Sequence, residues 1–273
     1  MPTSSLLLLL ADGRFPAGAH AHSGGLEAAV AAGRVTDLAS LEAFLVGRLA
    51  TAGLVGAAFA AAAHRAAVTP ASVGPGARPV GLGHPARRAT TPTDPGVRPA
   101  VAADSAVRGE APADASPCRN ALARLDAELD ARTASPALRG VSRRQGRALL
   151  RAGRAIWSAG PFDDLPATPQ GAHQPLVLGL LCAAAGLNRA ETATVAAYGT
   201  VTGAASAGVR LLGLDPYQVQ ALLVGLTDLC DGTAADAARA ADDPPERLPA
   251  AAAPLADIYA EAHATWEVRL FAS

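Results

Sequence analysis

The chain has 273 residues and a mass of 27.2 kDa, half of its residues are hydrophobic, and its formal net charge is −1. All 23 of its cationic residues are Arg. The absence of Lys excludes a Walker-A phosphate loop and a Schiff-base enzyme, because both need a Lys amine. The near-neutral charge provides no global basic field, so we expect no nucleic-acid partner.

Cysteines and apolar runs indicate the compartment. Cys118, Cys182 and Cys230 lie far apart and form no CxxC pair, which argues against a disulfide framework. The Leu run at 6–10 is too short for a signal peptide and has no basic residue before it. No segment offers the roughly 18 consecutive strongly apolar residues of a membrane span. We therefore expect a cytoplasmic protein with no membrane contact.

Ala-rich stretches with Leu or Val at helical spacing dominate, and alternating β-branched and polar runs are absent, so the sequence predicts an all-α fold. Ser135-Pro136 and Asp215-Pro216 each combine an N-cap residue with Pro at the first helical position, and Asn188 with Glu191 has the form of a capping box. We expect one helical bundle domain over 1–273, with about nine helices. They are predicted at 23–32, 37–49, 53–67, 119–132, 136–159, 174–185, 189–212, 216–230 and 254–267.

Two stretches lack the helical pattern. Residues 66–117 hold nine of the 21 Pro residues and show no apolar periodicity, which predicts a disordered insertion between two helices. A linker between two domains is the alternative, but the three helices before the stretch provide too little chain for an independent core. Residues 231–249 are acidic and Pro-rich and predict a solvated loop.

The predicted helix 189–212 carries apolar residues at spacings of three and four. Gly199, Gly203 and Ala207 lie four apart on a neighbouring face, where small side chains allow another helix to approach closely. The helix is either part of the buried core or a contact with another chain. A second helix, predicted at 136–159, places Arg143, Arg147, Arg151 and Arg154 on one face, which could bind phosphates, bind an acidic protein surface, or simply be solvated.

The only grouping with possible chemistry is near the N-terminus. His20, His22 and Glu27 lie within eight residues of each other, and a metal-dependent hydrolase using them is one hypothesis. The His-x-His spacing is a weak signal with no recognisable third ligand, so a structural His at a helix start is preferred. Ser23 is not in a nucleophile elbow. We therefore expect no catalytic site, metal or cofactor, and a binding or scaffold protein.

Three segments resemble one known family in the same order along the chain. Residues 15–27, FPAGAHAHSGGLE, are similar to the N-terminal signature of the urease accessory protein UreF family. Residues 204–214, AASAGVRLLGL, resemble its Ser-Ala-x-Val-(Arg/Lys)-Leu-x-Pro-Leu segment, with Gly213 where many relatives have Pro. Residues 269–273, RLFAS, match its Arg-Leu-Phe-x-Ser terminus.

The resemblance implies a non-catalytic, all-α, dimeric chaperone. Such proteins bridge the accessory protein UreD (also called UreH) and the GTPase UreG, and the assembly delivers nickel to apo-urease. A helical ligand-binding or regulatory module remains a further alternative.

The resemblance also suggests roles for individual residues. Tyr198 and Arg210 fall on the helix that contacts UreG across the dimer in relatives. Arg269, Leu270 and Phe271 match the tail that becomes ordered when UreD binds, although Phe271 could instead fold onto this chain's own core. The signature residues His22, Ser23 and Glu27 are expected to gate metal transfer or to position the GTPase.

Overall fold

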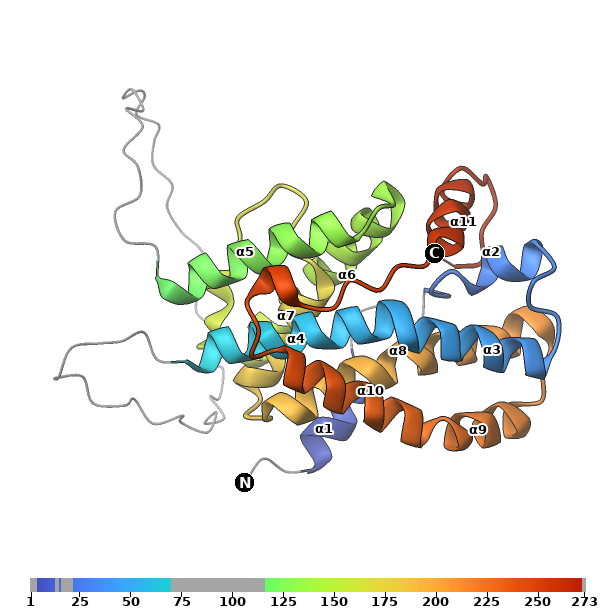
Figure 1. Cartoon of the computed structure of the whole chain (residues 1–273), viewed down its shortest axis with the longest axis horizontal. Helices are drawn as coiled ribbons and strands as arrows, with labels where there is room; N and C mark the ends of the chain where they lie inside the picture. The colour runs from blue at the N-terminus through green and yellow to red at the C-terminus, as the bar shows by residue number, and fades with distance from the viewer. Residues whose placement is uncertain (1–3, 13–14, 16–21, 70–115, 272–273) are drawn as a thin grey trace, which may run out of the picture.

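The computed structural model describes residues 4–12, 15, 22–69 and 116–271, and within these ranges every regular element is a helix (Figure 1). The all-α prediction is confirmed. The predicted insertion 66–117 lies mostly outside the described residues; its first residues extend α4 and its last begins α5.

One long helix forms the centre of the structure. It consists of α3 (Leu38–Arg48), a π-helical turn (Leu49–Gly53) and α4 (Leu54–Val68). The Asp37 carboxylate caps its start by accepting the Ser40 N–H at 2.8 Å. Residues 57–64 of α4 are all buried, and most are Ala, so neighbouring helices approach α4 on every side. Neighbouring backbones can lie this close because Ala side chains are small.

The central helix also qualifies the expectation that no segment could span a membrane. Leu38–Val68 is 31 residues long and, by length and composition only, apolar enough to cross one. The helix packs against α7, α8 and α10, which is the usual environment of a core helix in a globular protein. Its apolar composition is therefore accounted for by packing within the chain.

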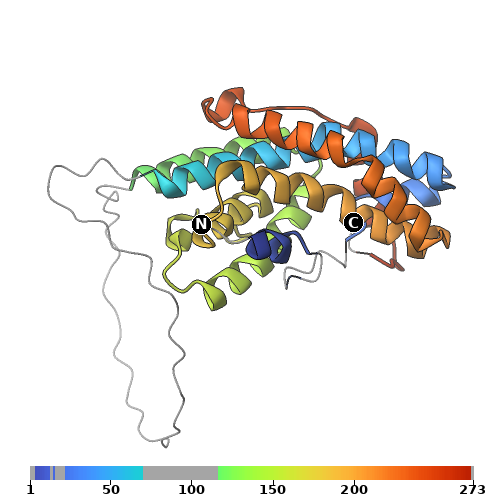
Figure 2. The same cartoon turned by 90° about the horizontal axis from the view of Figure 1, so that it is seen from below.

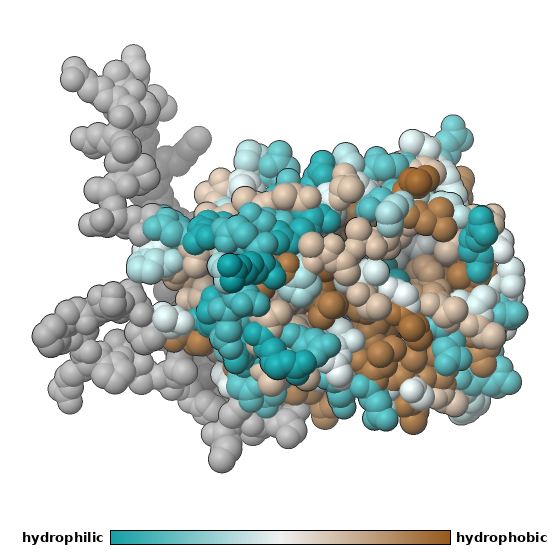
Figure 3. Space-filling model, in the orientation of Figure 1, coloured by the Kyte–Doolittle hydropathy of each residue, from teal (hydrophilic) through white to brown (hydrophobic). Residues whose placement is uncertain are grey.

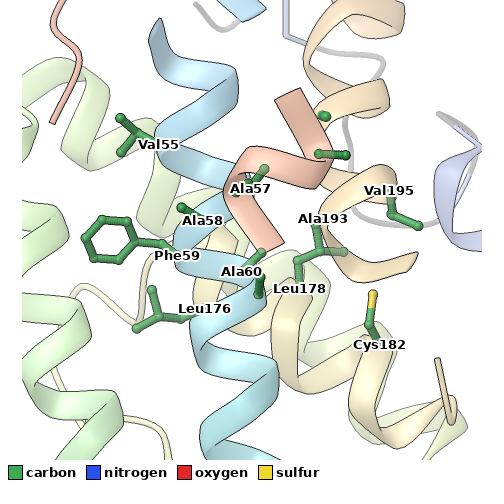
Figure 4. Close-up of a cluster of buried hydrophobic side chains, with 14 of the residues drawn as sticks. Val55, Ala57, Ala58, Phe59, Ala60, Leu176, Leu178, Cys182, Ala193 and Val195 are labelled. Carbon is green, nitrogen blue, oxygen red and sulfur yellow. The ribbon is translucent and has the colours of Figure 1, made fainter. Parts of the chain in front are cut away.

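Four helices surround α4: α5 (Pro117–Arg132), α7 (Gln174–Ala184), α8 (Arg189–Leu212) and α10 (Thr227–Ala240). Figure 4 shows Phe59 of α4 beside Leu176 of α7, with Cys182 of α7 and Ala193 of α8 in the same buried cluster. The closest approach is at Gly179, where an added Cβ would lie 2.3 Å from the Ala60 carbonyl oxygen. Only Gly allows α7 to pack this close to α4.

Helix α6 (Pro136–Ile156) packs on the outside of α7 and is tied to α5 by a buried polar network. His173 is fully buried, and its backbone N–H donates to the Asp126 carboxylate. Its ring Nε2 lies 3.0 Å from the Asp130 carboxylate, and its ring Nδ1 lies 3.0 Å from Ser142 Oγ. Arg143 donates to both carboxylates, at 3.0 Å and 2.9 Å. Burial, aided by the Arg143 charge, lowers the pKa of His173.

The C-terminal third differs from the prediction. Residues 231–240 are helical as part of α10, so the predicted solvated loop at 231–249 is wrong over that range. Ala234, Ala237, Ala238 and Ala241 recur at helical spacing and are buried, while the acidic side chains face outward.

The remaining elements are α1 (Ser4–Ala11), α2 (Leu26–Ala31), α9 (Pro216–Gly225), α11 (Pro254–Ala264), and short 3-10 turns at Pro161–Asp164 and Pro245–Arg247. The Leu-rich α1 was not predicted; it packs on α8.

Candidate functional site

Residues 23–27, at the start of α2, lie beside the C-terminal segment that follows α11 (Figure 1). Gly24 and Gly25 have φ values of 62° and 90°, a left-handed conformation that suits Gly, and they turn the chain into α2. Ser23 is buried, and its Oγ accepts the Glu27 N–H at 3.2 Å. Helix α2 therefore begins at Leu26, later than the predicted start at residue 23.

Glu27 holds the C-terminal tail in place. Its carboxylate is almost buried, with 8% of the residue exposed. One oxygen accepts the Leu270 N–H at 2.8 Å, and the other accepts the Phe271 N–H at 3.0 Å and lies 3.0 Å from His263 Nε2. His263 is itself 1% exposed and packs against the Trp266 ring. A single carboxylate thus binds both the tail backbone and the end of α11.

The tail carries an aromatic side chain that enters the core. Phe271 is 5% exposed, and the Arg210 guanidinium lies over its ring at 4.6 Å from the centroid. Leu270 points the other way and is 75% exposed, as is Val268 at 85%. Phe271 is therefore held inside the protein, whereas Leu270 and Val268 are exposed to solvent. We call the cluster of Glu27, Arg210, His263, Leu270 and Phe271 the tail junction.

A partly buried Arg that the sequence analysis did not single out supports the start of α2. The Arg48 guanidinium donates to the Gly24 carbonyl oxygen, and a Cβ at Gly24 would lie 2.8 Å from it. Burial lowers the pKa of Arg48 to about 10, so the side chain still carries its charge at neutral pH. Arg48 fixes the Gly24-Gly25 turn and thereby the position of Glu27.

The structure brings together some of the predicted site residues and separates others. Glu27, Arg210 and Phe271 are in contact with one another or with shared partners, and Ser23 supports Glu27. Arg269 is exposed. Tyr198, 42% exposed, lies twelve residues before Arg210 on α8, which is about 18 Å along the helix. His22 is partly buried, and His20 lies outside the described residues.

The geometry does not favour the metal hypothesis. Both carboxylate oxygens of Glu27 already accept hydrogen bonds from N–H groups. These oxygens are therefore occupied by donors and are not arranged to bind a metal cation. Among the residues that the structure describes, no group of three or more His, Cys, Asp or Glu side chains could hold a metal ion.

A cavity in the described part of the chain is also a poor ligand site. It has a volume of about 360 Å³ and lies between α4, α5 and the chain after α10. Its two Arg side chains already bond to protein oxygens: Arg65 donates to the Asp242 carbonyl at 3.3 Å, and Arg124 pairs with Glu246. The cavity gives no support to a ligand-binding module.

His263 and Arg143 are the residues whose roles the sequence did not reveal. His263 is one of two buried residues of α11, and nothing in its neighbourhood in sequence indicates a partner 236 residues away. Arg143 is not part of a free basic face; its side chain is 12% exposed and is bonded to Asp126 and Asp130.

Comparison with known proteins agrees with the resemblance seen in the sequence. The UreF family model matches residues 35–227. The chain is 38% identical to the urease accessory protein UreF of Mycolicibacterium vanbaalenii and 39% identical to that of Mycobacterium marinum, over 100% of both chains in each case. It is 37% identical to the UreF protein of Mycobacterium tuberculosis over 87% of this chain and 86% of the relative. The chain therefore belongs to the UreF family of urease accessory proteins.

Proposed function

We propose that this protein, as a single all-helical domain, bridges UreD (UreH) and the GTPase UreG on apo-urease during nickel insertion in the cytoplasm. Family membership supports the general role. In this proposal the chain performs no chemistry and holds no metal of its own; it positions the proteins that do. Its C-terminal tail contacts UreD, and the α8 surface contacts UreG.

The observation that carries the UreD assignment is the composition and exposure of the tail. Val268, Arg269 and Leu270 form an exposed segment with two large apolar side chains, although the backbone beside it is fixed by Glu27. A short segment held in a fixed position can bind a partner without losing much further conformational entropy. Arg is enriched among the residues that contribute most to protein interfaces, and the exposed Val268 and Leu270 side chains add apolar area on both sides of Arg269.

Two matched substitutions separate partner binding from folding. Leu270→Ala removes an exposed side chain and should leave the melting temperature unchanged while weakening co-purification with UreD. Phe271→Ala removes a buried side chain and should lower the melting temperature by several degrees, since burying one large apolar side chain contributes about 2–3 kcal/mol. Unchanged UreD binding by Leu270→Ala would contradict the proposed contact.

The UreG assignment rests on Tyr198 and Arg210, both exposed on α8. The surface next to Tyr198 is open: a Cβ added at Gly199 or Gly203 would meet no described atom within 4 Å. A second protein can therefore approach the α8 backbone closely there. Signature residues Ser23 and Glu27 contribute indirectly, by fixing the tail next to Arg210.

A homodimer is part of the proposal. Figure 3 shows a hydrophobic patch where α3, α9 and α10 lie in Figure 1. The exposed large apolar residues of these helices are Val46, Tyr217, Val224 and Leu229. Helix α9 buries only Val219, so its apolar surface is available for a second copy. Val224→Glu should then shift the sedimentation coefficient from that of a dimer to that of a monomer.

A further inference from the structure

Helix α6 has an unusual distribution of charge. Its 21 residues include six Arg and no Asp or Glu. Three of these Arg side chains serve the fold: Arg139 donates to the Thr133 carbonyl at 2.6 Å, Arg143 lies in the buried network, and Arg154 donates to Asp163 at 2.8 Å. The other three, Arg144, Arg147 and Arg151, are exposed. We call them the arginine row.

The arginine row is a continuous cationic strip. Its members are three and four residues apart, so they share one face of α6 and span about 10 Å along the helix. Arg147 donates to the Gln170 carbonyl, which leaves its charge unneutralised, and the structure records no ion pair between the row and any described residue. Figure 2 shows α6 on the opposite side of the molecule from α10, which carries Asp228, Asp231 and Asp236.

The surroundings of the row restrict what it can bind. A membrane surface would need a broad apolar face beside the Arg residues, but Val141 and Leu149 of α6 are buried, and the exposed Ile156 lies five residues beyond Arg151 at the end of the helix. Nucleic acid would need more phosphate contacts than three Arg side chains provide, and the chain as a whole has a net charge of −1. A protein helix with carboxylates at spacings of three and four fits both the charge and the length of the row.

We propose that the arginine row is a docking surface for an acidic helix of a partner protein. Each Arg meets one carboxylate of that helix, and the contact is distinct from the tail junction and from the apolar α9 surface. The proposal does not depend on the identity of the partners proposed above.

The test uses the full-length protein and a fluorescein-labelled, alanine-based helical peptide with three Glu residues at spacings of three and four. Fluorescence anisotropy is measured at low ionic strength, with a peptide carrying Gln in place of each Glu as the ligand control. The variant Arg144→Gln, Arg147→Gln, Arg151→Gln is compared with Arg34→Gln, Arg239→Gln, Arg247→Gln, which removes three exposed charges elsewhere.

We expect the wild-type protein to bind the Glu peptide and not the Gln peptide, with affinity that falls as salt is added. The row variant should bind about tenfold more weakly, which is what three exposed ion pairs contribute together. The control variant should bind as the wild type does. Equal losses in both variants would overturn the proposal, because net charge alone would then explain binding.

Two further results would also overturn it. One is that the wild-type protein binds a DNA duplex or phosphatidylglycerol vesicles more tightly than the peptide and that the row variant loses this binding. The other is a change in the sedimentation coefficient of the row variant, which would assign the row to a contact between copies of this chain. Circular dichroism of both variants excludes unfolding as the cause of any loss.

Discussion

Replacing Glu27 by Ala tests whether one carboxylate fixes the C-terminal tail. The substitution removes the acceptor for the Leu270 and Phe271 N–H groups and the partner of His263. Leaving a buried donor unsatisfied costs about 1–3 kcal/mol. The tail can avoid that cost by undocking from the rest of the protein. The decrease in the free energy of unfolding is therefore limited to what docking contributes, mainly burial of Phe271. Burying one large apolar side chain contributes about 2–3 kcal/mol, and we expect the free energy of unfolding to fall by that amount.

Trypsin detects the same change locally. Arg269 is exposed, but the peptide bond after it is held because the Leu270 N–H donates to Glu27. We expect Glu27→Ala to speed cleavage after Arg269 and to lower the urea midpoint. Glu267→Ala, an exposed change in the same segment, is the matched control and should affect neither. If Glu27→Ala leaves both the midpoint and the cleavage rate at wild-type values, the carboxylate does not hold the tail.

Four other predictions follow from separate parts of the structure. Arg210→Ala should weaken UreG binding without unfolding the protein, and an unchanged titration would contradict the UreG assignment. Gly179→Ala forces a Cβ into the α4 backbone and should cost more than about 2 kcal/mol in urea unfolding, whereas Gly56→Ala, with room for the methyl group, should be neutral or slightly stabilising. Burial lowers the pKa of His64, whose Nε2 lies 2.7 Å from a carbonyl oxygen and whose Nδ1 has no partner. The neutral form is therefore favoured in the folded state, and the free energy of unfolding should fall as pH drops below about 6.5, less steeply in His64→Gln. Replacing 70–115 with a short Gly/Ser linker should leave the melting temperature within a few degrees of wild type, and a larger drop would show that the stretch packs.

Helix boundaries set by local chemistry could be predicted from sequence. The Asn188 side chain accepts the Glu191 N–H at 2.9 Å and the Glu191 side chain accepts the Asn188 N–H at 2.7 Å, as the capping box predicts. Ser135 likewise caps α6. These signals work because the interacting groups are only a few residues apart and need no tertiary structure.

Features that depend on contacts distant in sequence could not be predicted. Residues 231–240 of α10 were predicted as a loop because their Asp residues and Gly232 outweigh the short Ala spacing, whereas the burial that stabilises this part of the helix comes from α4 and α8. Arg143 looked like part of a solvated face because the two Asp residues that bind it belong to another helix. The number of Arg residues on α6 was visible in the sequence, but which of them remain exposed was not.

The three segments that resembled the UreF family seemed independent in sequence, yet they form one structural unit. Glu27 of the first segment binds the backbone of the last, and Arg210 of the middle segment covers Phe271. Gly208, also in the middle segment, packs against Leu26 of the first segment and Leu41 of α3; an added Cβ would lie 3.5 Å from Leu26, an ordinary contact, but 2.9 Å from Leu41. A change in any one segment therefore alters the packing of the other two. The first and middle segments thus supply the groups against which the third segment, the tail, is held.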